Sequence, residues 1–384
     1  MAEEPKPELL GLSLQELTRV ALEAGQPRYR GRQLFQAIYC QNVSSAREIS
    51  NLPRGFRQRI EEGFSLGLPK IESKFTSGDG TLRYLIGLAD GESVETVWMP
   101  HGDGGEAGDG SEAGREQESE ARKPHAATIC VSSQVGCALD CQFCLTALLG
   151  IKRNLTAGEI LGQICAVLRE RQVSLPLNRI NLVFMGMGEP FLNYDNFLKA
   201  VRLLVEGVGL AESRMTVSTA GIVPRIYDFG REQVRPKLAI SLNAPNDQLR
   251  SRLMPLNRKW NLETLMTAAR EFPLRNRERL TFEYVLLHQV NDSQANAREL
   301  VELIRGTRSK VNLIALNPGP GIGLETPTQA RVLAFQKILR DADVPAFIRR
   351  PRGRDIYAAC GQLKRTLEPP SAETTAPGGP RKVG

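Results

Sequence analysis

The sequence has 384 residues, of which 41% are hydrophobic, and it carries a net charge of +7; a chain of this size predicts one large core with smaller appendages. Seven cysteines, an odd number scattered apart from one triplet, exclude the disulfide framework of a small secreted protein. The chain shows neither a signal-peptide pattern nor an apolar run of membrane-spanning length, so we expect a cytoplasmic protein that lies in no membrane.

The charge is unevenly distributed along the chain. Residues 101–122 hold seven acidic side chains and two arginines, which leaves an excess of +12 on the remainder. An excess of this size favours binding to a polyanion such as RNA. A general contribution to solubility is the alternative, and charge alone does not exclude it.

The first part of the chain, residues 1–99, predicts an accessory domain of helices followed by strands. Ser13 and Glu16 form a capping box ahead of an apolar helical pattern, and Tyr29 to Gln41 has helical spacing as well. The helical part carries six arginines that suggest a basic face for RNA, at Arg28, Arg30, Arg32, Arg54, Arg57 and Arg59.

Residues 71–99 predict an antiparallel meander, because glycine-containing turns at 78–80 and 89–91 separate apolar runs. Glu95 interrupts the last of these runs. If its side chain faces the core it is a candidate base, whereas an outward-facing carboxylate is the commoner case on an alternating strand.

Two segments lack the apolar residues that a packed core needs. Residues 100–124 are rich in Gly, Glu and Ser and predict a flexible acidic insert, and residues 366–384 predict a disordered tail. Between the core and this tail, residues 350–365 form a C-terminal segment that contains Cys360.

From residue 125 to 349, predicted strands and helices alternate. Strands are expected at 128–132, 180–185, 215–218, 238–242, 280–287, 311–316 and 346–348. Helices are expected near 156–171, 194–205, 261–271, 295–305 and 326–340, the first capped by Thr156 with Glu159 and the last with a capping box at Thr326. About six βα units of this kind imply an α/β fold with a parallel sheet, either a partial barrel or a doubly wound sheet.

In either architecture the reactive loops follow the carboxyl ends of the strands. Five loops with polar or glycine residues fall at such ends, so we expect them to line one pocket. They are the cysteine triplet with its flanks, residues 186–190, 218–221 and 241–243, and Asn317 with Pro318.

The triplet consists of Cys137, Cys141 and Cys144, separated by three and then two residues. A structural zinc site needs four ligands, and the nearest histidine, His125, does not stand at zinc-ligand spacing. Three thiolates on a four-iron cluster leave one iron open to a small molecule. We therefore favour an open iron–sulfur cluster over an incomplete zinc knuckle or three unrelated core cysteines.

The glycines of residues 186–190, the sequence GMGEP, permit close approach of the backbone to a ligand, and Glu189 places an acceptor beside it. This motif is weak alone. Next to a cluster loop it predicts a site for the amino group of an amino-acid-like cofactor, whose ribose or carboxylate Ser218 and Asn243 could bind.

Longer strings carry a resemblance to a known family. The cysteine loop and the Gly-Glu-Pro loop resemble those of radical S-adenosylmethionine enzymes. Four strings together resemble the RlmN/Cfr family of RNA methyltransferases, especially its RlmN branch, over residues 12–363: CVSSQVGCALDC at 130–141, GMGEP at 186–190, NAPND at 243–247 and AACGQL at 358–363.

The resemblance implies a fold, cofactors and an activity. The fold is a radical S-adenosylmethionine partial (βα)6 barrel with a small N-terminal accessory domain. Cys137, Cys141 and Cys144 hold a [4Fe-4S] cluster whose open iron binds S-adenosylmethionine, two molecules of which are consumed per methylation. The implied cofactor pocket consists of Gly188, Glu189, Ser218, Ser241, Leu242, Asn243 and Asn317.

The implied reaction is methylation of adenine C2 in the peptidyl transferase centre of 23S rRNA and in the tRNA anticodon loop, by a monomer that receives electrons from a donor such as flavodoxin. Cys360 accepts a methyl group, a radical formed from a second cofactor molecule activates it, and it adds to the base. Cys130 then resolves the RNA–protein crosslink through a transient disulfide, and Glu95 matches the proton acceptor.

The sequence departs from the family pattern in two places. Asn243 stands where the family commonly has His, and the acidic insert is unusually long. Cys40 and Cys165 match no role and are expected in the core. The alternatives are methylation at adenine C8, as in the Cfr branch, a radical enzyme acting on a small molecule, and a zinc-stabilised RNA-binding protein without enzyme activity.

Overall fold

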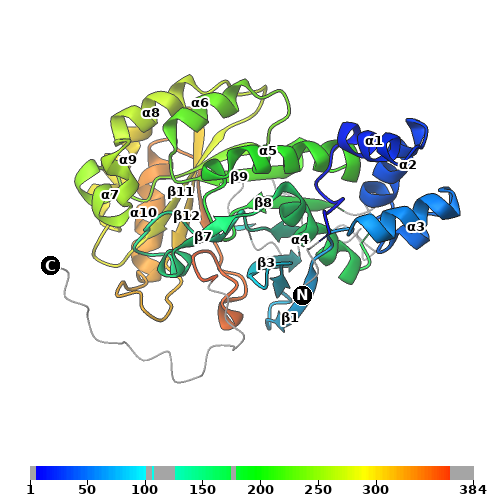
Figure 1. Ribbon diagram of the computed structural model, residues 1–384. Coiled ribbons are helices and arrows are strands. Elements are labelled where there is room, and N and C mark those ends of the chain that lie inside the picture. Colours follow the sequence, from blue (N-terminus) through cyan, green and yellow to red (C-terminus); the bar gives the residue numbers. More distant parts are fainter. Residues whose placement is uncertain (1–5, 101–105, 108–125, 174–178, 364–384) are drawn as a thin grey trace, which may run out of the picture.

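The computed structural model describes residues 6–100, 106–107, 126–173 and 179–363. Its core is an eleven-stranded mixed sheet with the order β1-β2-β3-β5-β8-β9-β10-β11-β12-β13-β4 (Figure 1). Seven neighbouring strands in the middle of this order run parallel: β5 (Ala127–Cys130), β8 (Ile180–Phe184), β9 (Met215–Thr219), β10 (Lys237–Ser241), β11 (Leu280–Leu286), β12 (Ser309–Ala315) and β13 (Ala346–Arg349).

Helices connect the parallel strands and cover the outside of the sheet (Figure 1). They are α4 (Ala157–Glu170), α5 (Tyr194–Leu203), α6 (Val223–Arg231), α7 (Asp247–Leu253), α8 (Leu262–Glu271), α9 (Gln294–Ile304) and α10 (Gln329–Asp341). Among the described residues the first and last strands of the order do not pair with each other, so the sheet stays open. The predicted α/β partial barrel is confirmed, and all seven predicted parallel strands are present.

The meander consists of β1 (Lys70–Thr76), β2 (Leu82–Gly87) and β3 (Ser93–Pro100), which pair antiparallel as predicted. Strand β3 also pairs antiparallel with β5, and the register places Val97 opposite Cys130. The meander is therefore an extension of the barrel sheet, and the boundary that the sequence suggests at residue 99 lies inside one continuous sheet.

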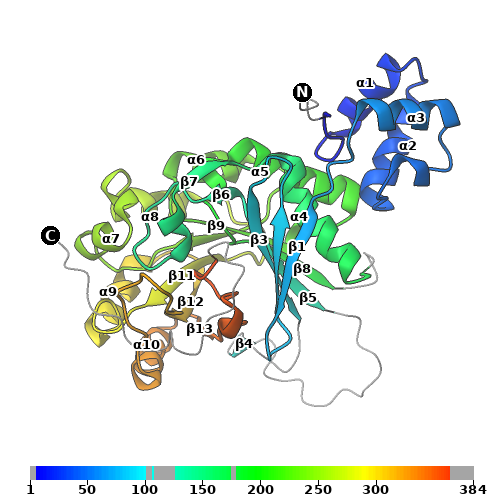
Figure 2. The same cartoon turned by 60° about the horizontal axis from the view of Figure 1, so that its bottom comes forward.

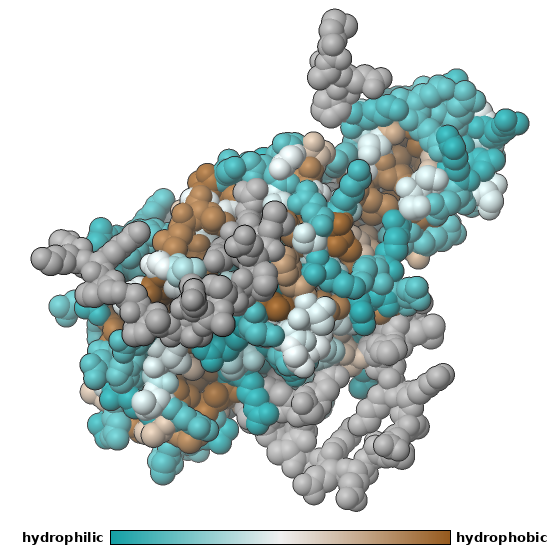
Figure 3. Space-filling model, turned by 90° about the horizontal axis from the view of Figure 1, so that it is seen from below, coloured by the Kyte–Doolittle hydropathy of each residue, from teal (hydrophilic) through white to brown (hydrophobic). Residues whose placement is uncertain are grey.

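The helical module of the N-terminal part stands off from the barrel (Figure 2). It contains α1 (Leu14–Glu23), α2 (Tyr29–Phe35) and α3 (Arg54–Gly63), and α2 continues into the π-helical turn η1 (Gln36–Cys40). Hydrophilic side chains cover much of its outer end in the view from below (Figure 3).

The module meets the barrel where η1 packs against a second π-helical turn, η5 (Leu204–Val208), which extends α5. A Cβ atom added at Gly207 would lie 2.7 Å from the Cβ of Tyr39, so only glycine fits there. The Tyr39 hydroxyl donates to the Leu12 carbonyl and accepts from the Gly11 amide. The Gly207 contact joins the module to the extension of α5, and the Tyr39 hydrogen bonds hold η1 to the segment that precedes α1.

Two of the predicted helix caps are confirmed and one is wrong. Ser13 and Thr156 form complete capping boxes with Glu16 and Glu159. Helix α10 begins at Gln329 with Thr328 as its cap, whereas the Thr326 hydroxyl donates 2.9 Å to the Leu316 carbonyl. Thr326 is bonded to the residue that directly follows β12, and the helix begins only after Thr328, whose side chain accepts from the Arg331 amide.

Most of the acidic insert, the tail 366–384 and the last two residues of the C-terminal segment lie outside the described residues. Within the insert, β4 (Glu106–Ala107) pairs antiparallel with β13, so these two residues are part of the sheet. None of the described helices is long and apolar enough to cross a membrane.

Candidate active site

The loops that the sequence predicts to line a pocket follow β5, β8, β9, β10 and β12. Because these strands are parallel, their carboxyl ends lie at one edge of the sheet, and the five loops meet there. The arrangement confirms that the cysteine triplet shares one mouth of the barrel with the glycine-containing loops.

The cysteine loop is held by a small hairpin of β6 (Gln134–Gly136) and β7 (Ile151–Asn154). The Cys137 amide donates to the Gly150 carbonyl at 3.0 Å. Gly136 has φ +82°, and a Cβ atom there would lie 1.8 Å from the same carbonyl oxygen, so the position accepts only glycine. The hairpin therefore fixes the start of the loop, and Cys144 leads directly into the 3-10 turn η3 (Leu145–Leu149).

The three thiols of the triplet interact electrostatically with one another. Burial raises the pKa of Cys137 to about 12, and it raises the pKa of Cys141 well above its usual range, with the neighbouring triplet cysteines adding to both shifts. No three His, Cys, Asp or Glu side chains of the described residues are gathered tightly enough for a single metal ion. A four-iron cluster binds each cysteine through a different iron, so this donor set fits the cluster.

The glycines of the 186–190 loop closely approach other parts of the chain. A Cβ atom at Gly186 would lie 2.6 Å from the Val131 carbonyl oxygen. At Gly188, where φ is +95°, a Cβ atom would lie 2.5 Å from the Cβ of Gln134. The loop is thus packed tightly onto the turn after β5.

Gln134 joins the two central loops, and sequence reasoning assigned it no role. Its side-chain oxygen accepts hydrogen bonds from the Glu189 amide at 2.9 Å and from the Ala138 amide at 3.4 Å. Its side-chain nitrogen donates to Asn154 in the hairpin at 2.8 Å. A buried glutamine within a motif carries no spacing signal of its own, so only the fold reveals this contact.

The Glu189 carboxylate connects the second loop to the third. Its two oxygens accept the Phe191 amide at 3.0 Å and the Ala220 amide at 2.7 Å. Burial raises its pKa to about 7, although these hydrogen bonds oppose the shift. The group is therefore a buried acceptor between two loops, beside the thiols of Cys137 and Cys141.

Ser218 and Ser241 lie together, with their hydroxyl oxygens 3.2 Å apart. Arg250 of α7 is fully buried, and its side chain donates hydrogen bonds to the backbone carbonyls of Ser241 and Leu242. The sequence did not single out this residue. Arg250 also donates 2.7 Å to the Ala220 carbonyl and 2.9 Å to Asn257. Its guanidinium group therefore fixes the loops after β9 and β10.

We expect Arg250→Met to lower the free energy of unfolding by about 3 kcal/mol or more, because three buried carbonyl groups lose their donor. The loosened loops should also weaken S-adenosylmethionine binding. Thermal melting and ligand titration measure these two effects. Arg252→Met on the exposed side of the same helix is the control and should melt as the wild type does; an unchanged melting temperature for Arg250→Met would contradict the assignment.

The predicted pocket residues Asn243 and Asn317 differ in what their side chains contact. Asn243, with φ +59°, accepts the Val285 amide at 2.8 Å and donates to the sulfur of Met254, so its amide is already used within the protein. Asn317 donates 3.2 Å to the Cys360 carbonyl. Its side-chain oxygen is buried and has no partner among the described residues. An orphaned acceptor at this mouth fits a polar cofactor such as S-adenosylmethionine.

Glu95 is fully buried on β3 and forms an ion pair with Arg83 of β2, which is also fully buried. Its neighbour Thr96 reaches Gln163 of α4, on the helix-covered face of the sheet. Glu95 therefore points to the opposite, inner face, as the interpretation of this residue as a base requires. The partner Arg83 was not foreseen, because a basic residue on a strand gives no sign of the side chain it will meet.

Cys130 shares the inner face with Glu95, since it stands opposite Val97 in the β3–β5 ladder. Burial raises its pKa above its usual range, and the Cys360 thiol adds to the shift. Cys360 is accessible to solvent. Partial desolvation of its thiol by the surrounding protein raises its pKa to about 11, and the negative charge of the nearby Glu283 carboxylate adds to this shift. The fold thus brings together two cysteines that lie 230 positions apart in the sequence.

The two remaining cysteines lie outside this site. Cys165 is buried on α4, as expected. Cys40 is exposed at the end of η1, where its thiol donates to the Gly207 carbonyl, so the expectation that it lies in the core is wrong. The Cys40 side chain lies at the junction with η5, which covers it only in part.

Two models of known protein families match parts of this chain. Residues 131–301 match the radical SAM superfamily, and residues 7–66 match the ribosomal RNA large subunit methyltransferase N-terminal domain. The first match covers the cysteine loop and the loops after β8, β9 and β10, and the second covers the helical module.

The relatives cover nearly the whole chain. A probable dual-specificity RNA methyltransferase RlmN of Koribacter versatilis is 64% identical over 89% of this chain and 97% of its own length. The dual-specificity RNA methyltransferase RlmN of Syntrophobacter fumaroxidans is 45% identical over 91% and 96%. The crystal structure of a radical SAM methyltransferase from Sphaerobacter thermophilus superposes with a TM-score of 0.83 at 41% identity, covering 93% of this chain and 99% of that one.

These matches, with three cysteines on one loop at the mouth of an open βα barrel, identify the chemistry as that of a [4Fe-4S] cluster and S-adenosylmethionine acting on RNA. The chain belongs to the RlmN family of radical S-adenosylmethionine RNA methyltransferases.

Proposed function

We propose that this enzyme methylates C2 of one adenine in the peptidyl transferase centre of 23S rRNA, and C2 of an adenine in the tRNA anticodon loop, through a methyl group carried on Cys360. The observation that supports this most is the meeting of Cys130 and Cys360 at the mouth that also holds the cysteine triplet. Simple methyl donation to a nucleophile would need neither cysteine pair nor cluster. The names of the relatives, dual-specificity RNA methyltransferases, agree with two RNA substrates.

The C2 atom of adenine is not nucleophilic, so it cannot displace a methyl group from a sulfonium ion. When bound, the cluster and S-adenosylmethionine supply a methyl group to a thiolate and a carbon radical that can remove hydrogen from that methyl group. Cys360 provides the thiolate and carries the methyl carbon to the base. Asn317, bonded to the Cys360 carbonyl, holds this segment at the mouth.

Glu95 and Cys130 act on the crosslink between Cys360 and the base. Glu95 accepts the proton that leaves C2 while the unpaired electron of the adduct would return to the bound cluster, and the buried guanidinium group of Arg83 forms an ion pair with the Glu95 carboxylate. Cys130 then attacks the sulfur of Cys360. The disulfide bond forms as the bond between sulfur and the methylene carbon breaks, and the electron pair passes to that carbon, which takes up a proton.

The helical module provides a surface for RNA in this proposal. Arg28, Arg32, Arg54 and Arg59 are exposed on it, and the exposed ring of Tyr29 lies 4.8 Å from the guanidinium carbon of Arg30. Positive side chains beside an exposed aromatic ring suit phosphates and unstacked bases. We further propose that the enzyme works as a monomer in the cytoplasm and takes electrons from a carrier such as flavodoxin.

The regiochemistry is tested on RNA after reaction. We expect nuclease digests of 23S rRNA and tRNA treated with the enzyme to contain 2-methyladenosine, identified by mass spectrometry against synthetic standards. RNA that already carries the modification is the control and should gain nothing. The 8-methyl isomer in the digest would assign the enzyme to the Cfr type of reaction, and unmodified tRNA would remove the second substrate.

A further inference from the structure

Apolar side chains are exposed on the loops that surround the cluster ligands. The described residues include eight strongly exposed large hydrophobic side chains, and half of them lie here. They form what we call the hairpin patch, made of Leu148, Leu149, Ile151 and Leu192. Leu148 and Leu149 end η3, Ile151 begins β7, and the Leu192 carbonyl accepts the side chain of Asn154 at the end of β7. An exposed apolar group of this kind commonly marks an interaction site.

The hairpin patch lies directly outside the cluster ligands. Cys144 precedes η3, and the Cys137 amide is bonded to Gly150, which stands between Leu149 and Ile151. The inner side of η3 faces the C-terminal segment instead, since Leu145 is buried and its amide donates 2.8 Å to the Gly361 carbonyl. Leu148 follows Leu145 by one turn of η3, and these two side chains approach Gly321 and Gly319 of the loop after β12, so the patch also borders that loop.

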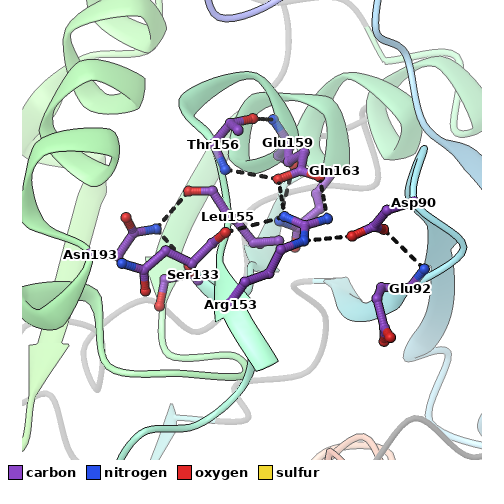
Figure 4. A network of polar contacts seen from close by, with 10 residues as sticks. Asp90, Glu92, Ser133, Arg153, Leu155, Thr156, Glu159, Gln163 and Asn193 are labelled. Carbon is purple, nitrogen blue, oxygen red and sulfur yellow. Dashed lines mark hydrogen bonds and ion pairs between the residues drawn. The ribbon is translucent and has the colours of Figure 1, made fainter. Parts of the chain in front are cut away.

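The hairpin that carries the patch is held rigidly (Figure 4). Arg153 of β7 donates 2.6 Å to Asp90 in the turn between β2 and β3, and it pairs with Glu159 of α4 at 2.7 Å. Asn193 donates to the carbonyls of Ser133 and Leu155 on either side of the hairpin. A surface fixed in this way loses little conformational freedom when a partner binds.

Positive side chains border the cysteine loop on its other flank. The Gln142 amide donates 3.0 Å to the Leu253 carbonyl, which joins the loop to the end of α7. Arg252, Arg258 and Lys259 are exposed on this segment, and its acidic residue Asp247 is used in hydrogen bonds to Asn257. The cysteine loop thus has exposed apolar side chains on one flank and cations on the other, which is complementary to an acidic protein surface that also carries apolar side chains.

We propose that the hairpin patch is the docking surface for the acidic electron-carrier protein that reduces the cluster. This inference rests on the electron donor of the proposed function. In each encounter the carrier's reduced flavin loses one electron and the cluster gains it, and no atom is transferred.

The test compares two reductants on the full-length, cluster-loaded enzyme. In the triple variant Leu148→Gln, Leu149→Gln, Ile151→Gln, we expect the KM for reduced flavodoxin to rise about tenfold, as truncation of central interface residues usually gives. The rate with dithionite should stay unchanged, because a small reductant needs no docking surface. Leu333→Gln, which removes an equally exposed leucine on α10, is the control and should affect neither rate.

The measured product is 5′-deoxyadenosine. It forms before any methyl group reaches RNA, so an error in the assigned base, carbon atom or RNA leaves this readout unaffected. Arg252→Glu is a second variant, and its effect on the flavodoxin KM should shrink as salt is raised. An unchanged flavodoxin KM in the triple variant would overturn the proposal. So would an equal loss with both reductants, or a weaker RNA affinity with normal reduction by flavodoxin, which would assign the patch to RNA.

Discussion

Cys360→Ala enzyme, purified without oxygen, is expected to keep its cluster and to leave RNA unmethylated. The cluster ligands lie on another segment, and the contacts of the C-terminal segment with η3 and Asn317 are made by backbone groups of residues 360, 361 and 363, which the substitution leaves in place. Weak cleavage of S-adenosylmethionine should therefore persist. Without the sulfur no side chain can carry the methyl group to the base, so methylation falls to background.

Iron content, 5′-deoxyadenosine and methylated RNA measure the three parts of this expectation separately. Cys40→Ala is the matched control, because Cys40 is also an exposed cysteine but lies at the junction between η1 and η5. That variant should methylate RNA normally. Normal methylation by Cys360→Ala would contradict the mechanism, whereas loss of iron in it would show that the segment supports the cluster as well.

Much of the fold follows from local sequence patterns. The parallel strands are short apolar runs with turn residues at both ends, and this pattern survives in any tertiary context. Helices α6 and α7 were missed for local reasons too. Helix α6 contains Pro224 and Gly230, and α7 has only seven residues with the charged Arg250 on its buried side. The pairing of β3 with β5 could not be predicted, because the partner of an edge strand is set by long-range packing.

The residues of the candidate site likewise fall into those that can be recognised from the sequence and those that cannot. Cysteines at fixed spacing and the strings around Cys130 and Cys360 can be recognised from sequence, because their chemistry demands those residue types. Gln134, Arg250 and Arg83 cannot, since each is defined by partners distant in sequence: Arg250 bonds Ala220, thirty positions earlier. A buried polar side chain acquires its role only when the fold supplies its partners. The same holds for Asn243, whose amide supports β11 and does not point freely into the pocket.

Cys130→Ala should produce a covalent complex between enzyme and RNA. The earlier steps need only Cys360 and the cofactors, so the base should still become linked to Cys360. Resolution then fails, because Cys130 is the neighbouring thiol on the inner face of β5 and the alanine cannot attack the sulfur. A band of reduced mobility on a denaturing gel, removed by nuclease and by protease, measures the adduct.

The wild-type disulfide gives an independent check on the same step. Turnover without added thiol should leave a bond between Cys130 and Cys360, which peptide mass spectrometry detects, and a reductant should restore activity. Cys165→Ala is the matched control, since Cys165 is equally buried but lies on α4, and it should give neither adduct nor loss of turnover. Free methylated RNA from Cys130→Ala would refute the role of Cys130. An adduct that forms with Cys165→Ala as well would show that burial of any thiol, and not its position opposite Cys360, controls release of the RNA.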